Sequence, residues 1–339
     1  MGRRPTGPHG RLTRRIAARA VVGALLVVLL TVGGGEWRSA RGADPATHDW
    51  MRSLYVVSDL ATHPPQTPVV LLLGGSSTRE STISDHSWSD QIVSRGGPRV
   101  VTRNLSSRNQ TFAQDLHLVG LLPSTPTVVF IGVNVGRFFA DPTTRFQAEP
   151  GPYERLSQHR YTKQRILTPQ RKERVAAEWM RRRYPPFAER FAANRAALEQ
   201  VVATCLERGL RPVMLDMPRN TAVIGDRLDV PIGEYSRACA ELAARYRVPF
   251  VSFVSRAGLE SGDFFDIAHL VEPGRAKWQR LLSDTTVDLL TEYGMTVAGE
   301  PPPETNGEIH DWCVSSRIGV PVFAPQSATL APLDSAPED

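Results

Sequence analysis

Three short polar segments of the chain contain side-chain types that can form a nucleophile, a base with its carboxylate, and an oxyanion donor. Ser76 lies in a Gly-Gly-Ser-Ser turn directly after an apolar run, Asn134 ends another apolar run, and Asp266 precedes His269 by three residues. An imidazole can take the proton of an attacking hydroxyl, a carboxylate can hold that imidazole in one tautomer, and an amide can donate to an oxyanion. Each residue alone also has an ordinary explanation, because short polar residues are common in turns and helix caps. The segments therefore predict acyl-transfer chemistry only if the fold brings them together.

Five apolar runs rich in valine are typical of buried strands in a parallel sheet. They are bounded mostly by Gly, Pro, Asn or Asp and span residues 68–75, 99–105, 127–134, 211–218 and 248–254. Helical patterns alternate with them at residues 111–122, 187–209, 233–246 and 274–294, and a further helix is indicated around residues 49–60. This alternation predicts an α/β fold, a flavodoxin-like doubly wound three-layer sandwich with a five-stranded parallel sheet. Such sheets bind ligands at the carboxyl ends of their strands, where the Ser76 and Asn134 turns belong.

The order of the polar segments resembles the SGNH hydrolases, the GDSL-type esterase superfamily, over residues 68–290. The first block of that family, Gly-Asp-Ser, corresponds to residues 74–76, and the third, Gly-x-Asn-Asp, to residues 132–135. The fifth block, Asp-x-x-His, corresponds to residues 266–269. Here glycine replaces the aspartate of the first block, and valine replaces the last aspartate of the third. The first block is more similar to that of membrane-attached bacterial members than to that of the secreted lipases.

The resemblance implies a role for each matched residue. Ser76 would be the nucleophile, His269 its general base, and Asp266 the carboxylate that orients the imidazole. The oxyanion hole would consist of the backbone N–H groups of Ser76 and Ser106 and the side-chain amide of Asn134. Ser106, or its neighbour, is the nearest equivalent of the glycine in the family's second block. On this interpretation Asn134→Ala slows turnover and leaves folding almost unchanged.

The N-terminal segment has the charge pattern of a membrane anchor or export signal. Residues 1–19 carry several arginines and no acidic residue, and residues 20–37 are almost entirely apolar up to a tryptophan. The 16 residues from Ala20 to Gly35 would span about 24 Å as a helix, slightly less than a hydrocarbon core of about 30 Å. Basic residues before the apolar block predict a cytoplasmic N-terminus and an extracytoplasmic catalytic domain. If the signal is cleaved, the protein is secreted instead.

The remaining chain divides into four predicted parts. Residues 38–67 are a linker with a short helix, and residues 68–297 are the α/β domain. A basic insertion at about 139–186 contains the amphipathic pattern of residues 171–184, which fits a solvated helix face, a lid, or a surface for anionic lipid or polysaccharide. The tail, residues 298–339, is proline-rich and predicted to be disordered.

Several classes of site are disfavoured by the sequence. Cys205, Cys239 and Cys313 form no CxxC pair, so no metal site is predicted, although a Cys205–Cys239 disulfide is an open alternative. The net charge of +5 and pI of about 9.4 come from widely spread arginines without a nucleic-acid-binding motif. No phosphate-binding glycine motif follows the first strand. We therefore expect no cofactor, no metal and no nucleic-acid partner.

The predicted function is that of a membrane-tethered serine esterase or O-acyltransferase outside the cytoplasm. Its substrate would be a small acyl ester or an O-acylated glycan of the cell envelope, with acetyl as one candidate acyl group. Water and a sugar hydroxyl compete for the same acyl-enzyme, so the sequence leaves hydrolysis and transfer open. The alternative is an inactive member of the fold that binds glycans or assists assembly, because fold does not imply function.

Overall fold

The computed structural model describes residues 45–144 and 160–295. The predicted basic segment 1–19, the membrane segment 20–37, the start of the linker and the tail 298–339 lie outside these residues. Within the two described ranges, none of the helices combines the length and the apolar character needed to cross a bilayer.

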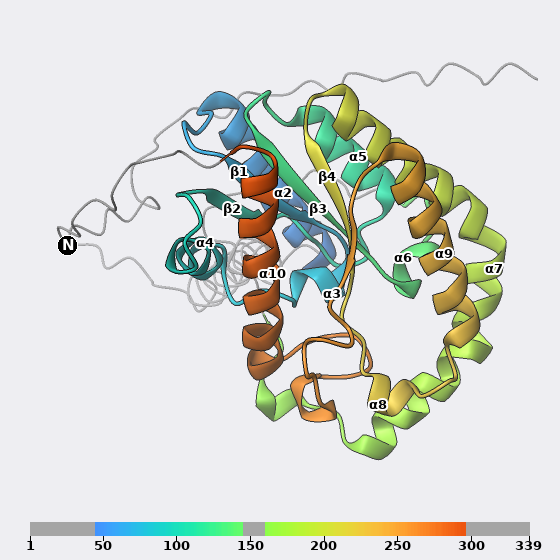
Figure 1. Ribbon diagram of the computed structural model, residues 1–339. Helices are drawn as coiled ribbons and strands as arrows, with labels where there is room; N and C mark the ends of the chain where they lie inside the picture. The colour runs from blue at the N-terminus through green and yellow to red at the C-terminus, as the bar shows by residue number, and fades with distance from the viewer. Residues whose placement is uncertain (1–44, 145–159, 296–339) are drawn as a thin grey trace, which may run out of the picture. The chain divides into compact units, whose positions relative to one another are not determined.

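A five-stranded sheet forms the centre of the described residues (Figure 1). Its strands are β1 (Val69–Leu73), β2 (Val101–Asn104), β3 (Thr127–Val133), β4 (Arg211–Asp216) and β5 (Phe250–Ser252). The strand order is β2-β1-β3-β4-β5 and every pair is parallel. This confirms the predicted α/β fold with a five-stranded parallel sheet, and the order is that of flavodoxin-like proteins. The carboxyl ends of β1 and β3, which carry the predicted nucleophile and amide, are therefore adjacent.

Helices connect the strands and cover the sheet. The long ones are α2 (Pro45–Thr62), α4 (Asp85–Ser94), α5 (Phe112–Leu121), α7 (Pro169–Glu207), α9 (Asp229–Tyr246) and α10 (Glu272–Glu292). Short helical turns are α3 (Ser76–Arg79), α6 (Val135–Phe139), η2 (Lys163–Arg165), α8 (Thr221–Ile224) and η3 (Ser261–Asp263). The starts of α4 and α5 are capped by Ser84 and Thr111, whose hydroxyls accept backbone N–H bonds.

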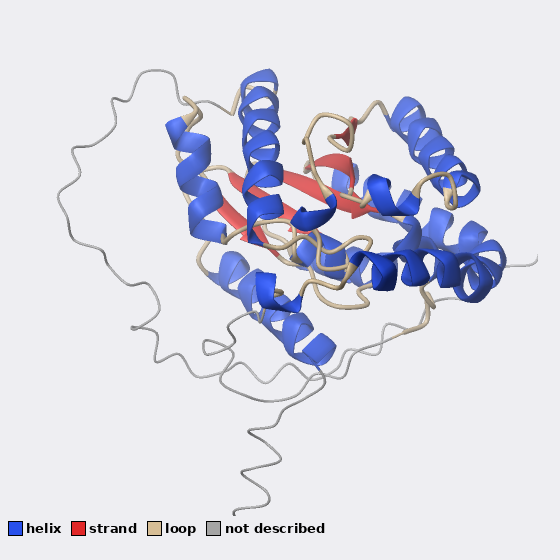
Figure 2. Cartoon of the chain, turned by 90° about the horizontal axis from the view of Figure 1, so that it is seen from below, coloured by secondary structure: helices blue, strands red, loops and turns tan. Residues whose placement is uncertain are grey.

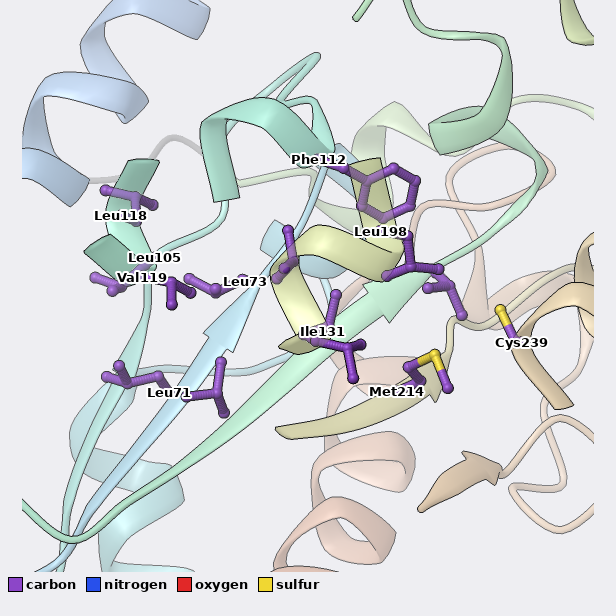
Figure 3. Close-up of a cluster of buried hydrophobic side chains, with 14 of the residues drawn as sticks. Leu71, Leu73, Leu105, Phe112, Leu118, Val119, Ile131, Leu198, Met214 and Cys239 are labelled. Atoms are coloured by element: carbon purple, nitrogen blue, oxygen red, sulfur yellow. The ribbon is translucent and has the colours of Figure 1, made fainter. Parts of the chain in front are cut away.

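Helices cover both faces of the sheet (Figure 2). Alternate residues of β1, β3 and β4 enter two separate cores, one on each face. On β1, Leu71 and Leu73 pack under α2, α5, α7 and α9, whereas Val70 and Leu72 pack under α4 and α10. Figure 3 shows part of the first core, in which Leu71, Leu73 and Ile131 lie beside side chains from the covering helices. All five β1 residues are buried, so the strand is anchored from both sides. This burial on both faces fixes the position of the turn at residues 74–76, which follows β1.

Helix α7 differs from the sequence-based expectation. The basic pattern 171–184 and the pattern 187–209 were expected as separate helices, but they form one helix that continues through Pro185 and Pro186. Their rings leave the carbonyls of residues 181 and 182 without a helical donor, and both of those residues are exposed, so water can satisfy them. Packing on the inner side also favours continuity, because Trp179 and Phe187 contact each other across the proline pair. The second part of the predicted insertion is thus the first half of α7.

Cys205 and Cys239 are buried in α7 and α9 as free thiols, so the alternative of a disulfide between them is not realised in this structure. Burial raises the pKa of Cys205 to about 12 and also raises the pKa of Cys239. Both act as small apolar side chains of the core. Cys313 lies outside the described residues.

Candidate active site

The turn after β1 is shaped by close packing against β3. Gly74 and Gly132 lie on either side of the Thr78 side chain, and a Cβ atom on either glycine would come within 2.3 Å of Thr78 Oγ1. No larger residue fits at these two positions without displacing α3. Ser76, the first residue of α3, is thereby held at the carboxyl edge of the sheet. The run of two glycines and two serines is therefore a tightly packed turn that also presents a hydroxyl.

The structure brings Ser76, His269 and Asp266 together in one hydrogen-bonded line. Ser76 Oγ lies 2.8 Å from His269 Nε2. On the other side of the imidazole ring, Nδ1 lies 2.8 Å from Asp266 Oδ2 and 2.9 Å from Oδ1. Asp266 Oδ1 also accepts the backbone N–H groups of Ala268 and His269, at 2.9 and 3.0 Å. This is the geometry in which an imidazole can accept the proton of a serine hydroxyl.

The charges of the Asp266–His269 pair favour a basic imidazole beside an ionised carboxylate. Burial lowers the pKa of His269, but the negative charge and hydrogen bond of Asp266 outweigh it, so the pKa of His269 is raised above its ordinary 6.5. Burial raises the pKa of Asp266, but His269 and the two backbone donors outweigh it, so the net shift is downward. Asp266 is therefore ionised near neutral pH and can stabilise an imidazolium.

The loop that carries Asp266 and His269 is fixed by several backbone bonds. An antiparallel bridge between Phe264 and Leu270 closes the loop, and the Phe265 N–H donates to the His269 carbonyl at 2.7 Å. The Asn220 side chain donates to the Asp266 carbonyl at 3.3 Å. These bonds hold the acid–imidazole turn in place without help from the nucleophile.

Two side chains from the segment before and within α7 also contact this loop. The Tyr161 ring stacks on Phe265, with ring centres 4.1 Å apart, and meets the His269 ring edge-on at 5.5 Å. The buried Lys172 amine donates to the carbonyls of Phe264, at 2.9 Å, and Ser261. Neither contact could be predicted from the sequence, because both residues are more than 85 positions from their partners along the chain.

Asn134 lies at the start of α6 with its amide facing the nucleophile turn. Its Oδ1 accepts the backbone N–H of Arg137 at 3.0 Å, which caps α6, and its Nδ2 donates to Ser77 Oγ at 2.5 Å. Asn134 lines the same cleft as Ser76. Because the side chain is a helix cap as well as a donor, the expectation that Asn134→Ala leaves folding unchanged needs revision.

Ser106 is not brought to the cleft with the other predicted residues. It is fully buried, and its N–H donates to Asn104 Oδ1 at 3.1 Å, so that N–H is already used inside the protein. The next loop position that faces the cleft is Asn109, which lines it beside Ser76. Among the described residues, the backbone N–H groups of Ser76 and Asn109 have no hydrogen-bond acceptor. Asn109 has φ +57°, a left-handed conformation that asparagine tolerates, and this tolerance is the one signal that could have identified it.

Buried ion pairs stabilise the helical turn α3, which begins with Ser76, and connect it to helix α10. Arg79 Nε lies 2.8 Å from Asp49 Oδ2, and Glu80 pairs with both Arg79 and Arg275. The Arg275 Nε also donates to the Glu80 carbonyl at 3.0 Å, which ties α10 to the residue after α3. Arg79 and Glu80 are both buried and paired, so they support the turn and are not placed to contact a substrate.

Behind the Asn134 turn, Arg137 and Asp115 form a second buried pair, with 2.6 Å between Nη2 and Oδ2. Gln110 extends the pair by donating to Asp115 Oδ1 at 2.6 Å and accepting the Ser107 N–H at 2.8 Å. Removing one member of such a network would leave a buried charge unpaired. The network links the loop of Asn109 to the turn of Asn134, so the two candidate oxyanion donors share one support.

The carboxyl edge of the sheet opens into a cleft of about 700 Å³. Ser76, Asn134 and His269 line one part of it, and residues of α6, α7 and α8 line the rest. Within the described ranges, no group of three or more His, Cys, Asp or Glu side chains could hold a metal ion. The arrangement therefore places a serine hydroxyl, an imidazole, a carboxylate and amide N–H donors along a volume much larger than an acetyl group.

Comparisons with known proteins gave structural similarities only. No family model matches the chain, and no curated protein matches it. A GDSL-family lipolytic protein from Veillonella parvula is similar in structure at 9% identity and a TM-score of 0.41, covering 65% of this chain and 98% of its own. An acetyl xylan esterase is similar at 10% identity and a TM-score of 0.42, and the match covers 66% of this chain and 99% of the esterase. A GDSL-like lipase from Bacteroides thetaiotaomicron is similar at 11% identity and a TM-score of 0.37, and the match covers 70% of this chain and 97% of the lipase.

Proposed function

We propose that this protein is a serine esterase or O-acyltransferase of the SGNH type, with Ser76 as nucleophile, His269 as general base and Asp266 as the orienting carboxylate. The observation that carries the proposal is the unbroken line of hydrogen bonds from Ser76 Oγ through both ring nitrogens of His269 to Asp266. A binding protein has no need of this arrangement. The alternative of a non-catalytic glycan-binding protein is therefore the weaker one.

The proposed reaction proceeds by acyl transfer through the serine. His269 Nε2 takes the Ser76 proton as Oγ attacks the ester carbonyl, and the tetrahedral oxyanion is met by the N–H groups of Ser76 and Asn109 and the Asn134 amide. The imidazolium then returns its proton to the departing alkoxide, which leaves an acyl-enzyme. Water or a sugar hydroxyl attacks that ester in the second half-reaction, with His269 again as base, and free Ser76 is restored.

The setting of the reaction is part of the same proposal. The basic segment 1–19 followed by the apolar segment 20–37 supports a chain tethered to the membrane with its catalytic domain outside the cytoplasm, or secreted after cleavage. The proposed substrates at that location are O-acylated glycans of the cell envelope. Protease treatment of intact cells, with detection of the α/β domain, distinguishes an outside from an inside location.

Labelling with a fluorophosphonate tests the proposal directly. A serine activated by a neighbouring base attacks phosphorus and keeps the label, so one equivalent should be found on the peptide that contains Ser76. The Ser77→Ala variant should be labelled at the same residue, which distinguishes the two adjacent hydroxyls. Labelling of Ser77 instead, or no labelling of the folded protein, would contradict the proposed nucleophile.

Substitution of Asn134 separates its two roles. Asn134→Asp keeps an oxygen that can cap α6 but removes the amide donor, so we expect a loss of about 10²–10³ in kcat with little change in melting temperature. Asn134→Ala should show the same kinetic loss together with about 1 kcal/mol of destabilisation from the missing cap. Kinetics with p-nitrophenyl acetate and urea unfolding measure the two effects. A kcat like that of the wild type in both variants would remove Asn134 from the oxyanion hole.

A further inference from the structure

One face of helix α7 forms a wall of the cleft. Its lining side chains are spaced by three or four residues, as expected for a single helical face: Val175, Trp179, Arg183, Pro186 and Arg190. Phe139 of α6 completes this wall, and its ring packs edge-on against Trp179 with 5.9 Å between ring centres. We call these six residues the α7 wall. It combines apolar surface with two guanidinium groups.

The two arginines of the α7 wall form no salt bridge with a carboxylate among the described residues, although the charge of Arg190 is felt by Asp141. The Arg183 guanidinium lies over the Phe139 ring at 5.0 Å, and Arg190 Nη1 donates to the Phe139 carbonyl at 3.2 Å. Neither forms a salt bridge in the described part of the chain. Each guanidinium has five N–H donors, so most of their hydrogen-bonding capacity is unused.

The other charged residues of the cleft have hydrogen-bond or salt-bridge partners within the protein. Arg137 is paired with Asp115, and Arg219 lies 2.9 Å from Asp216 Oδ1. Of the carboxylates that line the cleft, Asp266 is hydrogen-bonded to His269 Nδ1. Asp141 Oδ1 accepts two bonds from Thr143, at 2.7 and 2.9 Å. These bonds, with a smaller contribution from the charge of Arg190, lower the pKa of Asp141. The α7 wall is therefore the part of the cleft with positive charge available to a ligand.

We propose that the α7 wall binds an anionic group, a carboxylate or a phosphate, on the molecule whose ester is presented to Ser76. This inference rests on the proposed esterase or acyltransferase function and names its substrate class, an O-acylated polyanionic glycan or polyol phosphate. Arg183 and Arg190 bind the anion, since planar guanidinium groups form charge-assisted bonds with carboxylate and phosphate. The Phe139 and Trp179 surface packs against the body of the same molecule. The cleft volume of about 700 Å³ leaves room for that body beside the ester.

The kinetic test compares an acidic with a neutral acetylated glycan. Wild-type protein should have a kcat/KM for acetylated polygalacturonate at least about tenfold higher than for acetylated xylan, and the ratio should fall towards one as salt screens the charges. The double variant Arg183→Gln/Arg190→Gln should lose most of that ratio. The matched control is Arg174→Gln/Arg181→Gln, which removes two exposed arginines of the same helix at the same spacing outside the cleft. It should keep the wild-type ratio.

Equal losses in the two double variants would show a general charge effect and overturn the proposed subsite, as would an unchanged ratio in Arg183→Gln/Arg190→Gln. Urea unfolding of each variant checks that a lost ratio does not reflect a partly unfolded helix.

A binding measurement keeps this inference separate from the esterase proposal. Calorimetry with Ser76→Ala protein needs no catalysis, and it compares oligogalacturonate, a glycerol phosphate oligomer and a neutral xylo-oligosaccharide. Tighter binding of the uronate or of the phosphate oligomer, lost in the additional Arg183→Gln/Arg190→Gln background, supports the subsite and tells the two anions apart. Binding of neither anion more tightly than the neutral sugar overturns it, whether or not the wild type hydrolyses esters.

Discussion

Ser76→Ala is expected to lower kcat for p-nitrophenyl acetate by about four to six orders of magnitude. The hydroxyl is the atom that bonds to the acyl carbon, and no other side chain occupies its place on the Nε2 side of His269 in the described structure. The loss should be at least as large as that of any other single substitution in the site except one at His269, because the nucleophile and its base act as one unit. Steady-state kinetics and acyl-enzyme trapping by mass spectrometry measure it.

The fold should tolerate Ser76→Ala well. The serine is the first residue of α3, and its Oγ makes one hydrogen bond, to His269, so the expected change in unfolding free energy is about 1 kcal/mol or less. A folded Ser76→Ala protein with undiminished hydrolysis would reject Ser76 as nucleophile. The Ser77→Ala protein is the matched control, because it removes a hydroxyl one residue away and leaves the line from Ser76 to Asp266 intact.

The sequence predicted those parts of the fold that depend on local patterns. Valine-rich runs such as residues 127–134 bury both faces of a strand, so they are recognisable without their neighbours. The pairing of Asp266 with His269 could also be predicted, because the two residues are only three positions apart. The continuation of α7 through Pro185 and Pro186 could not be predicted, because it depends on the contact of Trp179 with the Phe187 ring beyond the two prolines.

The candidate site likewise contains residues that local patterns predict and residues that only tertiary contacts place. Ser106 was chosen by its place after β2, but the direction of a backbone N–H depends on which acceptor it meets, here Asn104 Oδ1. Asn109 faces the cleft because it takes a left-handed backbone conformation in the turn of residues 107–110. The types of the side chains alone do not predict that conformation. Lys172 reaches its partners only after α7 has packed against the loop of residues 261–264.

Asp266→Asn is expected to lower kcat by about 10⁴ while Ser76 and His269 stay in place. The asparagine amide can donate to Nδ1, which favours the tautomer with its proton on Nε2, the atom that must accept the serine proton. The negative charge that stabilises the imidazolium is lost as well. Asp263→Asn is the control, since it changes an acid of the same region that pairs with Lys277 rather than with the imidazole. It should keep activity near that of the wild type.

The pH profile gives Asp266→Asn a second readout that a merely structural change would not produce. In the wild type only neutral His269 can act as base, so kcat/KM should rise with pH through a midpoint above 6.5, because Asp266 raises the pKa of the imidazole. Without the carboxylate, burial is the main remaining influence and lowers the pKa of His269, so the midpoint should move to lower pH as the plateau falls. A lower plateau with an unmoved midpoint would show that Asp266 does not tune the base, and His269 would then need another partner to act as proposed.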